Sequence, residues 1–212
     1  MEKNFWQKKW DLNEIGFHQK ETSPLLEKYL NKIIYHNGTK SHCLIPLSGK
    51  TNDIIYLKNY FSLVTGVEII KKAVESFFSE NNFKPVQKEN CYTYENIEII
   101  HDDFFNLPNK TKLKYDFVFD RASIIALPEN LRFKYVNTVK SLLGPRFTIF
   151  LISIEYNSPD LIGPPFSVPE DEIHKHYAEF KIEKLYEKEI PTLSPKFKNI
   201  DVLQKLYIIE NH

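Results

Sequence analysis

Short runs of β-branched and aromatic residues alternate along this chain with longer stretches that have helical spacing. Such alternation is typical of βαβ units, because two parallel strands must be joined by a crossover, which is usually a helix. The sequence therefore predicts an α/β fold with a doubly wound, mostly parallel sheet. The five runs that we expect to form its strands are residues 42–45, 63–68, 98–101, 115–120 and 147–154.

Helices are expected between these strands, and a hairpin is expected at the C-terminal end. The stretches with helical spacing are residues 52–60, 71–81, 128–143 and 169–178. The third of them has a proline in its first turn and a glycine just after its end, as helices often do. Residues 181–187 and 202–209 alternate like two strands, with the proline-containing stretch 190–200 between them. We therefore expect an antiparallel hairpin at one edge of the sheet.

The length of the chain suits one domain. Its 212 residues are 42% hydrophobic and 26% charged, which is enough apolar surface for a single core. We expect residues 1–212 to form one domain, in which residues 1–40 are a helical N-terminal segment and residues 41–212 are the sheet core.

Charge and cysteine content exclude several partners and compartments. Lys plus Arg and Asp plus Glu number 28 each, so the chain has no net field that would attract nucleic acid or an anionic membrane. Cys43 and Cys91 form no CxxC pair, which favours a reduced, cytoplasmic setting. The strongest apolar run, residues 147–154, is far below the ~18 residues of a membrane span, and the first residues lack the apolar core of a signal peptide. We expect a cytoplasmic monomer that binds neither nucleic acid nor membranes.

The first predicted strand runs into the sequence PLSGKTND, and an acid ends the second strand. In a doubly wound sheet a nucleotide-like ligand approaches the backbone at this first turn, and Gly49 permits that approach. Glu68, 19 residues later, is placed to accept hydrogen bonds from the ribose hydroxyls of an adenosine. The structural alternatives are an ordinary turn glycine and a glutamate that caps the following helix. A phosphate-loop interpretation fails, because Leu44 stands where the Walker pattern needs glycine.

Polar and aromatic residues also follow the third and fourth predicted strands. Asp103 and Phe104 come after the third strand, where an acid can accept from an adenine amino group and a ring can cover the base. Arg121 follows the fourth strand, and its guanidinium suits the carboxylate of a cofactor or of an anionic substrate. The structural alternative is an ordinary surface ion pair between Arg121 and an aspartate.

Both tryptophans of the chain, Trp6 and Trp10, lie four residues apart near its start and share one helical face. In the simplest interpretation such an aromatic stripe packs against a core. A sulfonium cation is also attracted to aromatic faces, so the stripe is a candidate cover for a sulfonium cofactor.

Five blocks of the chain resemble thiopurine S-methyltransferases, most closely their bacterial branch. The blocks occur in the order and approximate spacing of that family and extend over nearly the whole chain. They are FWQKKWDLNEIGFHQKE, PLSGKTNDI, VTGVEI, DFVFDRASIIALPENLRFKY and GPPFSVPEDEI. The resemblance implies a Rossmann-like methyltransferase fold with a seven-stranded sheet, an antiparallel C-terminal edge hairpin and a helical N-terminal lid.

The resemblance also implies which residues contact the cofactor S-adenosylmethionine. Carried over position by position, these residues are Trp6, Trp10, Phe17, Leu47, Glu68, Asp103, Phe104 and Arg121. Asp103 and Phe104 fall in the block that matches the family least well. Ser48 stands where many relatives have cysteine, which matters little because the backbone makes the turn.

The acceptor site is expected between the N-terminal segment and a proline-rich stretch. The resemblance places Phe17 against both methyl donor and acceptor, and Pro164 in the Gly-Pro-Pro-Phe stretch against the acceptor. That stretch is interpreted either as part of a lid or as a rigid loop.

The family reaction is an in-line displacement in which a thiolate or selenolate attacks the sulfonium methyl. The enzyme aligns the nucleophile and excludes water, and an acceptor that ionises near neutrality needs no general base. We therefore assign no catalytic acid or base. No metal is expected, because His174 and His176 are two apart on a predicted helix and face different sides. The expected acceptor is a small aromatic or heterocyclic thiol, with selenium and tellurium compounds also compatible.

Three other functions share some of these features. A nicotinamide-dependent oxidoreductase also uses a glycine turn and a ribose carboxylate, but its full G-x-G-x-x-G is missing. A nucleic-acid methyltransferase is disfavoured by the balanced charge and by the lack of a target-recognition domain. A noncatalytic protein that keeps the S-adenosylmethionine pocket would bind the cofactor without transferring its methyl group.

Overall fold

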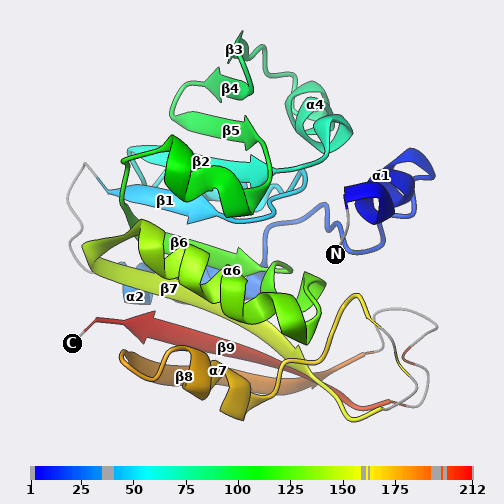
Figure 1. Ribbon diagram of the computed structural model, residues 1–212, viewed down its shortest axis with the longest axis vertical. Helices are drawn as coiled ribbons and strands as arrows, with labels where there is room; N and C mark the ends of the chain where they lie inside the picture. The colour runs from blue at the N-terminus through cyan, green and yellow to red at the C-terminus, as the bar shows by residue number, and fades with distance from the viewer. Residues whose placement is uncertain are drawn as a thin grey trace.

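Nine strands form one sheet in the part of the chain that the structure describes (Figure 1). The computed structural model describes residues 3–34, 41–158, 161, 163–191, 197 and 200–211. Across the sheet the strands follow the order β3-β4-β5-β2-β1-β6-β7-β9-β8. The chain thus starts near the middle of the sheet and proceeds first to one side and then to the other, as expected for a doubly wound fold.

Five neighbouring strands form the parallel centre of the sheet. They are β5 (Ile97–His101), β2 (Leu63–Glu68), β1 (His42–Ile45), β6 (Tyr115–Arg121) and β7 (Leu143–Glu155). Helices cover both faces of this centre, so residues on both sides of each strand are buried and the strands read as nearly continuous apolar runs. All five predicted strands are confirmed. The largest difference is at β7, which begins at Leu143, paired with Tyr115, rather than at residue 147.

The helices divide into two groups that cover opposite faces of the sheet. One group is α2 (Pro24–Ile33), α3 (Asp53–Leu57) and α4 (Lys71–Glu80), and the other is α5 (Leu107–Lys110), α6 (Glu129–Leu142) and α7 (Glu170–His176). Figure 1 shows α6 in front of β6 and β7, with α2 behind the sheet. The expected helices are confirmed, although α3 and α7 are shorter than predicted. None of the described helices is long and apolar enough to cross a membrane.

A helix and two short 3-10 turns lie at the carboxyl ends of the parallel strands. They are α1 (Lys3–Asp11), η1 (Phe104–Asn106) and η2 (Ile124–Ala126). The parallel strands point to the right in Figure 1, and α1 lies beyond their ends. This edge of the sheet is where we expected a ligand.

The predicted C-terminal hairpin is confirmed. β9 (Val202–Glu210) pairs antiparallel with β7, and β8 (Lys181–Ile190) pairs antiparallel with β9 to form the outer edge. Most of the stretch 190–200 that was expected to connect them lies outside the described residues.

A second antiparallel hairpin, at the other edge, was not predicted. β3 (Val86–Lys88) and β4 (Cys91–Tyr94) extend the sheet beyond β5, so the expected count of seven strands is too low and the described sheet is parallel only in its centre. The three residues of β3 are all exposed. A strand that buries no side chain needs no alternation of apolar and polar residues, so the sequence carried no signal for it.

The packing of Phe150 gives a test of this core. Its ring is buried against the rings of Phe117 and Phe119, with centroids 6.4 and 5.5 Å away. Phe150→Ala is expected to lower the free energy of unfolding by about 3–5 kcal/mol, because it removes buried surface and leaves a cavity. Urea denaturation followed by circular dichroism measures this change. The matched control is Phe133→Ala, whose ring is 67% exposed and whose loss should cost less than about 0.5 kcal/mol; equal effects would contradict the assigned core.

Candidate active site

The turn after β1 brings the backbone close to the end of β2. Leu47 and Gly49 have positive φ angles of 46° and 54°, and the amide of Ser48 donates to the carbonyl of Val67 over 2.9 Å. A Cβ atom on Gly66 in β2 would lie 2.9 Å from the Oγ of Ser48, so a larger residue there would have to displace the Ser48 side chain. The turn is therefore seated tightly on β2, with the backbone of Leu47 and Gly49 in a left-handed conformation.

Glu68, the last residue of β2, fastens this turn to the start of α4. Its carboxylate accepts hydrogen bonds from the amide of Gly49 over 2.8 Å and from the amide of Ile70 over 2.7 Å. Burial raises the pKa of Glu68 to about 7, although these backbone hydrogen bonds act to lower it. The structural alternative for Glu68 is supported, because the carboxylate accepts from the residue directly before α4, and its role as an acceptor for ribose hydroxyls stays a prediction.

Three aromatic rings from the N-terminal segment gather over the turn. Trp6 and Trp10 lie on α1, and the ring of Phe17 packs edge-on against both, with centroids 5.4 and 6.0 Å away. Trp10 is buried, and a Cβ atom on Gly49 would lie 3.6 Å from its ring. Phe17 remains 40% exposed. The cluster thus covers the turn and still presents an aromatic surface to a ligand.

The core-packing interpretation of the tryptophans is also correct for one of them. Trp10 packs with Ile70 and Ala73 at the start of α4, and Lys72 donates to the carbonyl of Trp10 over 2.8 Å. Trp6 packs only at the margin of this cluster. The segment is therefore fastened chiefly through Trp10, next to the carboxylate of Glu68.

Arg121, the last residue of β6, links three parts of the chain. Its guanidinium donates to the carboxylate of Asp53 over 2.5 Å and to the side-chain carbonyl of Gln19. Asp53 is buried and also accepts from the amide of Ser23 over 2.7 Å and from the hydroxyl of Thr51 over 2.8 Å. Arg121 thus connects the sheet to α3 and to the N-terminal segment.

Arg121 does form an ion pair with an aspartate, but the partner is the buried Asp53 and the pair does not lie at the surface; the neighbouring Asp120 is not its partner. Neighbouring residues in a strand point to opposite faces, and Asp120 points into the core, where it accepts from the hydroxyl of Tyr135 over 2.8 Å and from the amide of Ile124 over 3.1 Å. Burial raises the pKa of Asp120 to about 6. No sequence pattern indicated Asp53 and Gln19 as partners of Arg121, because they lie 68 and 102 residues away.

Asp103 and Phe104 follow β5 as predicted but are engaged within the protein. The carboxylate of Asp103 accepts from the amide of Phe105 over 3.0 Å and caps η1. Phe104 is buried, with its ring centroid 5.4 Å from that of Tyr135. Phe104 therefore belongs to the core beneath this end of the sheet, while Asp103 lies nearer the protein surface.

The unpredicted hairpin contributes to the same end of the sheet. Between β3 and β4, Asn90 donates to the carboxylate of Asp102 over 3.0 Å. Around this contact lies an open depression with a volume of about 700 Å³. Its lining residues are Glu89, Asn90, His101, Asp102 and Lys110.

The stretch that contains Pro164 folds back against the end of β6. The amide of Phe166 donates to the carbonyl of Ile125 in η2 over 2.7 Å, and the hydroxyl of Tyr156 donates to the carbonyl of Pro165 over 2.9 Å. A Cβ atom on Gly163 would lie 2.6 Å from the ring of Phe166, so glycine is required there. The structure thus places Pro164 on a fastened loop beside the turn that follows Arg121.

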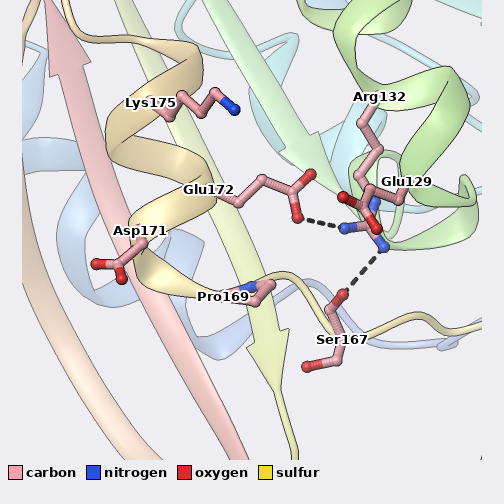
Figure 2. A pocket seen from close by; sticks show the side chains of 7 residues that line it. All are labelled: Glu129, Arg132, Ser167, Pro169, Asp171, Glu172 and Lys175. Carbon is pink, nitrogen blue, oxygen red and sulfur yellow. Dashed lines mark hydrogen bonds and ion pairs between the residues drawn. The ribbon is translucent and has the colours of Figure 1, made fainter.

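A second hollow lies behind this loop, between α6 and α7 (Figure 2). It has a volume of about 410 Å³ and is lined by Glu129, Arg132, Ser167, Pro169, Asp171, Glu172 and Lys175. No sequence pattern assigned a role to any of these residues. Arg132 is buried, although it lies in a helix whose sequence shows only an ordinary amphipathic pattern.

The groups at the strand ends fit the chemical parts of S-adenosylmethionine. Glu68 supplies an acceptor for hydroxyl groups, the three aromatic rings supply π faces for a sulfonium, and Arg121 supplies a planar cation for a carboxylate. These groups come from β2, α1 and its following loop, and β6, whose ends meet at one edge of the sheet.

Comparisons with known proteins agree with this geometry. The family model described as Thiopurine S-methyltransferase (TPMT) matches residues 1–211. A thiopurine S-methyltransferase of Vibrio vulnificus is 34% identical over 98% of this chain and 97% of its own length. One from Vibrio cholerae is 37% identical over 86% of this chain and 84% of its own length.

Solved structures of other methyltransferases share the fold at low sequence identity. The 1,6-didemethyltoxoflavin-N1-methyltransferase of Burkholderia thailandensis, solved with S-adenosylhomocysteine, aligns with a TM-score of 0.65 at 12% identity, over 99% of this chain and 87% of that chain. The N-methyltransferase NodS of Bradyrhizobium japonicum, also with S-adenosylhomocysteine, aligns with a TM-score of 0.63 at 12% identity, over 87% and 83% of the two chains.

The raised pKa of Glu68 predicts how stability depends on pH. The folded state holds this proton up to about pH 7, whereas a glutamate in the unfolded chain loses it near 4.5, so the folded protein binds more protons between these pH values. Stability should therefore fall as the pH rises from about 5 to 8, by on the order of 1–3 kcal/mol from this group. Chemical denaturation at a series of pH values measures it.

Two variants distinguish the contributions of Glu68 and Asp120 to the pH dependence of stability. Glu68→Gln should lose the fall in stability near pH 7, and Asp120→Asn should lose the part near pH 6. A wild-type pH profile in Glu68→Gln would contradict the assignment.

Proposed function

Because the chain belongs to the thiopurine S-methyltransferase family, and is thus an S-adenosylmethionine-dependent methyltransferase, we propose that it methylates the sulfur of small aromatic or heterocyclic thiols at the carboxyl ends of β1, β2 and β6. The observation that carries the proposal is the contact of the Glu68 carboxylate with the Gly49 amide beneath the aromatic cluster. This contact combines the ribose acceptor and the glycine turn in one place.

We assign the parts of the cofactor to the groups around this contact. Glu68 accepts from the ribose hydroxyls, and the backbone of Leu47, with its positive φ, faces the methionine portion. Asp103 marks the adenine end, with Phe104 as the floor beneath it. The ends of β2 and β5 lie side by side, since Glu68 of β2 pairs with His101 of β5.

The aromatic cluster and Arg121 serve the reacting end of the cofactor. The rings of Trp6, Trp10 and Phe17 surround the sulfonium, and the guanidinium of Arg121 binds the carboxylate. In the structure Arg121 is held by Asp53 and Gln19, which fix the plane of its guanidinium. A planar fork fixed in this way is prepared for a bidentate contact.

Methyl transfer requires alignment of the acceptor sulfur with the methyl group more than it requires a catalytic acid or base. S-adenosylmethionine supplies a methyl group on a sulfonium, so the acceptor sulfur forms the new carbon–sulfur bond while the old one breaks and its electron pair returns to the cofactor sulfur. Phe17 and Pro164 position the acceptor, and the N-terminal segment excludes water. A thiol that ionises near neutrality arrives as thiolate, so we assign no general base.

We further propose that residues 1–212 act as one domain and as a cytoplasmic monomer on a small-molecule acceptor. Both cysteines are free, and burial raises the pKa of the Cys91 thiol to about 12, which keeps it unreactive. A reduced compartment suits such thiols. Selenium and tellurium compounds stay within the proposed acceptor range.

The function is tested by a panel of acceptors. Purified protein with S-adenosylmethionine should form S-adenosylhomocysteine when given an aromatic or heterocyclic thiol, and aliphatic thiols, selenite and tellurite define the range. Mass spectrometry of the methylated product measures transfer. Tight binding of S-adenosylhomocysteine without turnover on any acceptor would instead indicate a noncatalytic binding protein.

Glu68→Gln tests the cofactor-binding part of the proposal. Above about pH 7, where the Glu68 carboxyl is ionised, the amide replaces a carboxylate that accepts charge-assisted bonds, so cofactor binding should weaken by about 1.5–3 kcal/mol, which is roughly 10–150-fold. Calorimetry on the folded variant measures the dissociation constant. Unchanged affinity would remove Glu68 from the site.

Arg121→Lys separates two roles for one cation. If Arg121 binds the cofactor carboxylate, the variant should weaken S-adenosylhomocysteine binding by about tenfold and lower turnover with every acceptor, because lysine lacks the planar fork. The data needed are the dissociation constant of S-adenosylhomocysteine and kcat/KM for one neutral and one carboxylated aromatic thiol. A wild-type dissociation constant with a defect confined to the carboxylated thiol would make Arg121 an acceptor-binding residue.

A further inference from the structure

The side chain of Arg132 spans two loops that follow different strands. From α6, its Nε donates to the carbonyl of Leu127 over 2.9 Å and its Nη2 donates to the carbonyl of Ser167 over 3.0 Å. Leu127 comes directly after η2, on the connection from β6, whereas Ser167 lies on the connection from β7. One guanidinium therefore joins the two connections at the acceptor side of the site.

The third nitrogen of the Arg132 guanidinium binds a third element. Its Nη1 forms an ion pair of 2.6 Å with Glu172 on α7, and Figure 2 shows this bond beside the bond to Ser167. The side chain of Arg132 is only 4% exposed. All three sides of the guanidinium are thus occupied, which fixes its position relative to both loops.

The loop that Arg132 holds is the one that carries Pro164. We call residues 163–167 the proline segment. The guanidinium carbon of Arg132 lies 6.0 Å from the centre of the Phe166 ring, and the amide of Phe166 donates to Ile125 in η2. The proline segment is therefore held against η2, three residues beyond Arg121, by its own backbone bond, and Arg132 contacts it at Phe166 and Ser167.

Stability alone is a weak reason for such an arrangement. The desolvation penalty of a buried ion pair is often as large as its Coulomb attraction. Apolar residues of similar volume can therefore often replace such a pair without loss of folding stability. A planar cation that bonds two loop carbonyls at once fixes the geometry of both loops, which apolar packing does less sharply.

We propose that Arg132 is a positioning residue that sets the distance between the proline segment and the Arg121 turn, and so shapes the site for the methyl acceptor. This role rests on the proposed function, because it needs an acceptor between Phe17 and Pro164. Arg132 does not touch the reacting atoms. It acts through Leu127 and Ser167 on the walls that the acceptor meets.

The test compares acceptor KM with cofactor affinity in two Arg132 variants. Arg132→Met should raise KM for an aromatic thiol by about tenfold and leave the dissociation constant of S-adenosylhomocysteine within about twofold of wild type. The double variant Arg132→Met/Glu172→Leu removes the lone charge that the single variant leaves, so its stability should recover. Its KM should remain raised, since both carbonyls are still released.

Lys140→Met provides the matched control. Lys140 lies on the same helix, pairs with Glu179 over 2.6 Å and donates to the carbonyl of His176, but it contacts neither loop. Its KM should stay at the wild-type value. A KM that returns to wild type in the double variant, or rises equally in Lys140→Met, would show that Arg132 has only a structural role.

The two proposals fail in different ways. A wild-type protein without turnover on any acceptor would overturn both of them. Wild-type turnover with a KM that the Arg132 variants do not change would overturn the positioning role alone.

Discussion

The buried carboxylate of Glu68 is the contact on which the arrangement of the site depends. It receives one amide from the turn after β1 and one from the entry to α4, so the first two βα units are joined at their carboxyl ends. Trp10 then packs on Gly49 and Ile70, the two residues whose amides Glu68 holds. The N-terminal segment therefore packs on backbone that the carboxyl group of Glu68 holds in place.

Two arginines extend this organisation to the other side of the site. Arg121 binds Asp53 and Gln19, and Arg132 binds Leu127 and Ser167, so each cation holds segments that no strand pairing connects. Parallel strands leave long connections at their ends, and those connections need side-chain bonds to acquire one conformation. The sheet supplies the frame, and polar side chains with several donors fix the loops that face the ligand.

The sequence predicted the features that depend on local pattern. The five parallel strands and the C-terminal hairpin were visible because their side chains alternate or are buried throughout, and Gly49 and Glu68 were visible because their spacing follows the strands. The hairpin of β3 and β4 was missed because both strands are short and β3 is exposed throughout. The partners of Arg121 and Arg132 were missed for another reason. Contacts such as that of Arg121 with Asp53, 68 residues apart, arise only once the sheet order brings helices and loops together.

The hairpins at the two edges also decide what the sheet presents to other copies of the chain. β3 ends one side with exposed residues that include Gln87 and Lys88, and β8 ends the other with alternating lysine and glutamate. Unpaired edge strands are templates for aggregation, and charged side chains along an edge oppose that pairing. The parallel strands that build the site are thereby kept away from both open edges, so the apolar runs that the chemistry requires do not expose their backbone to self-association.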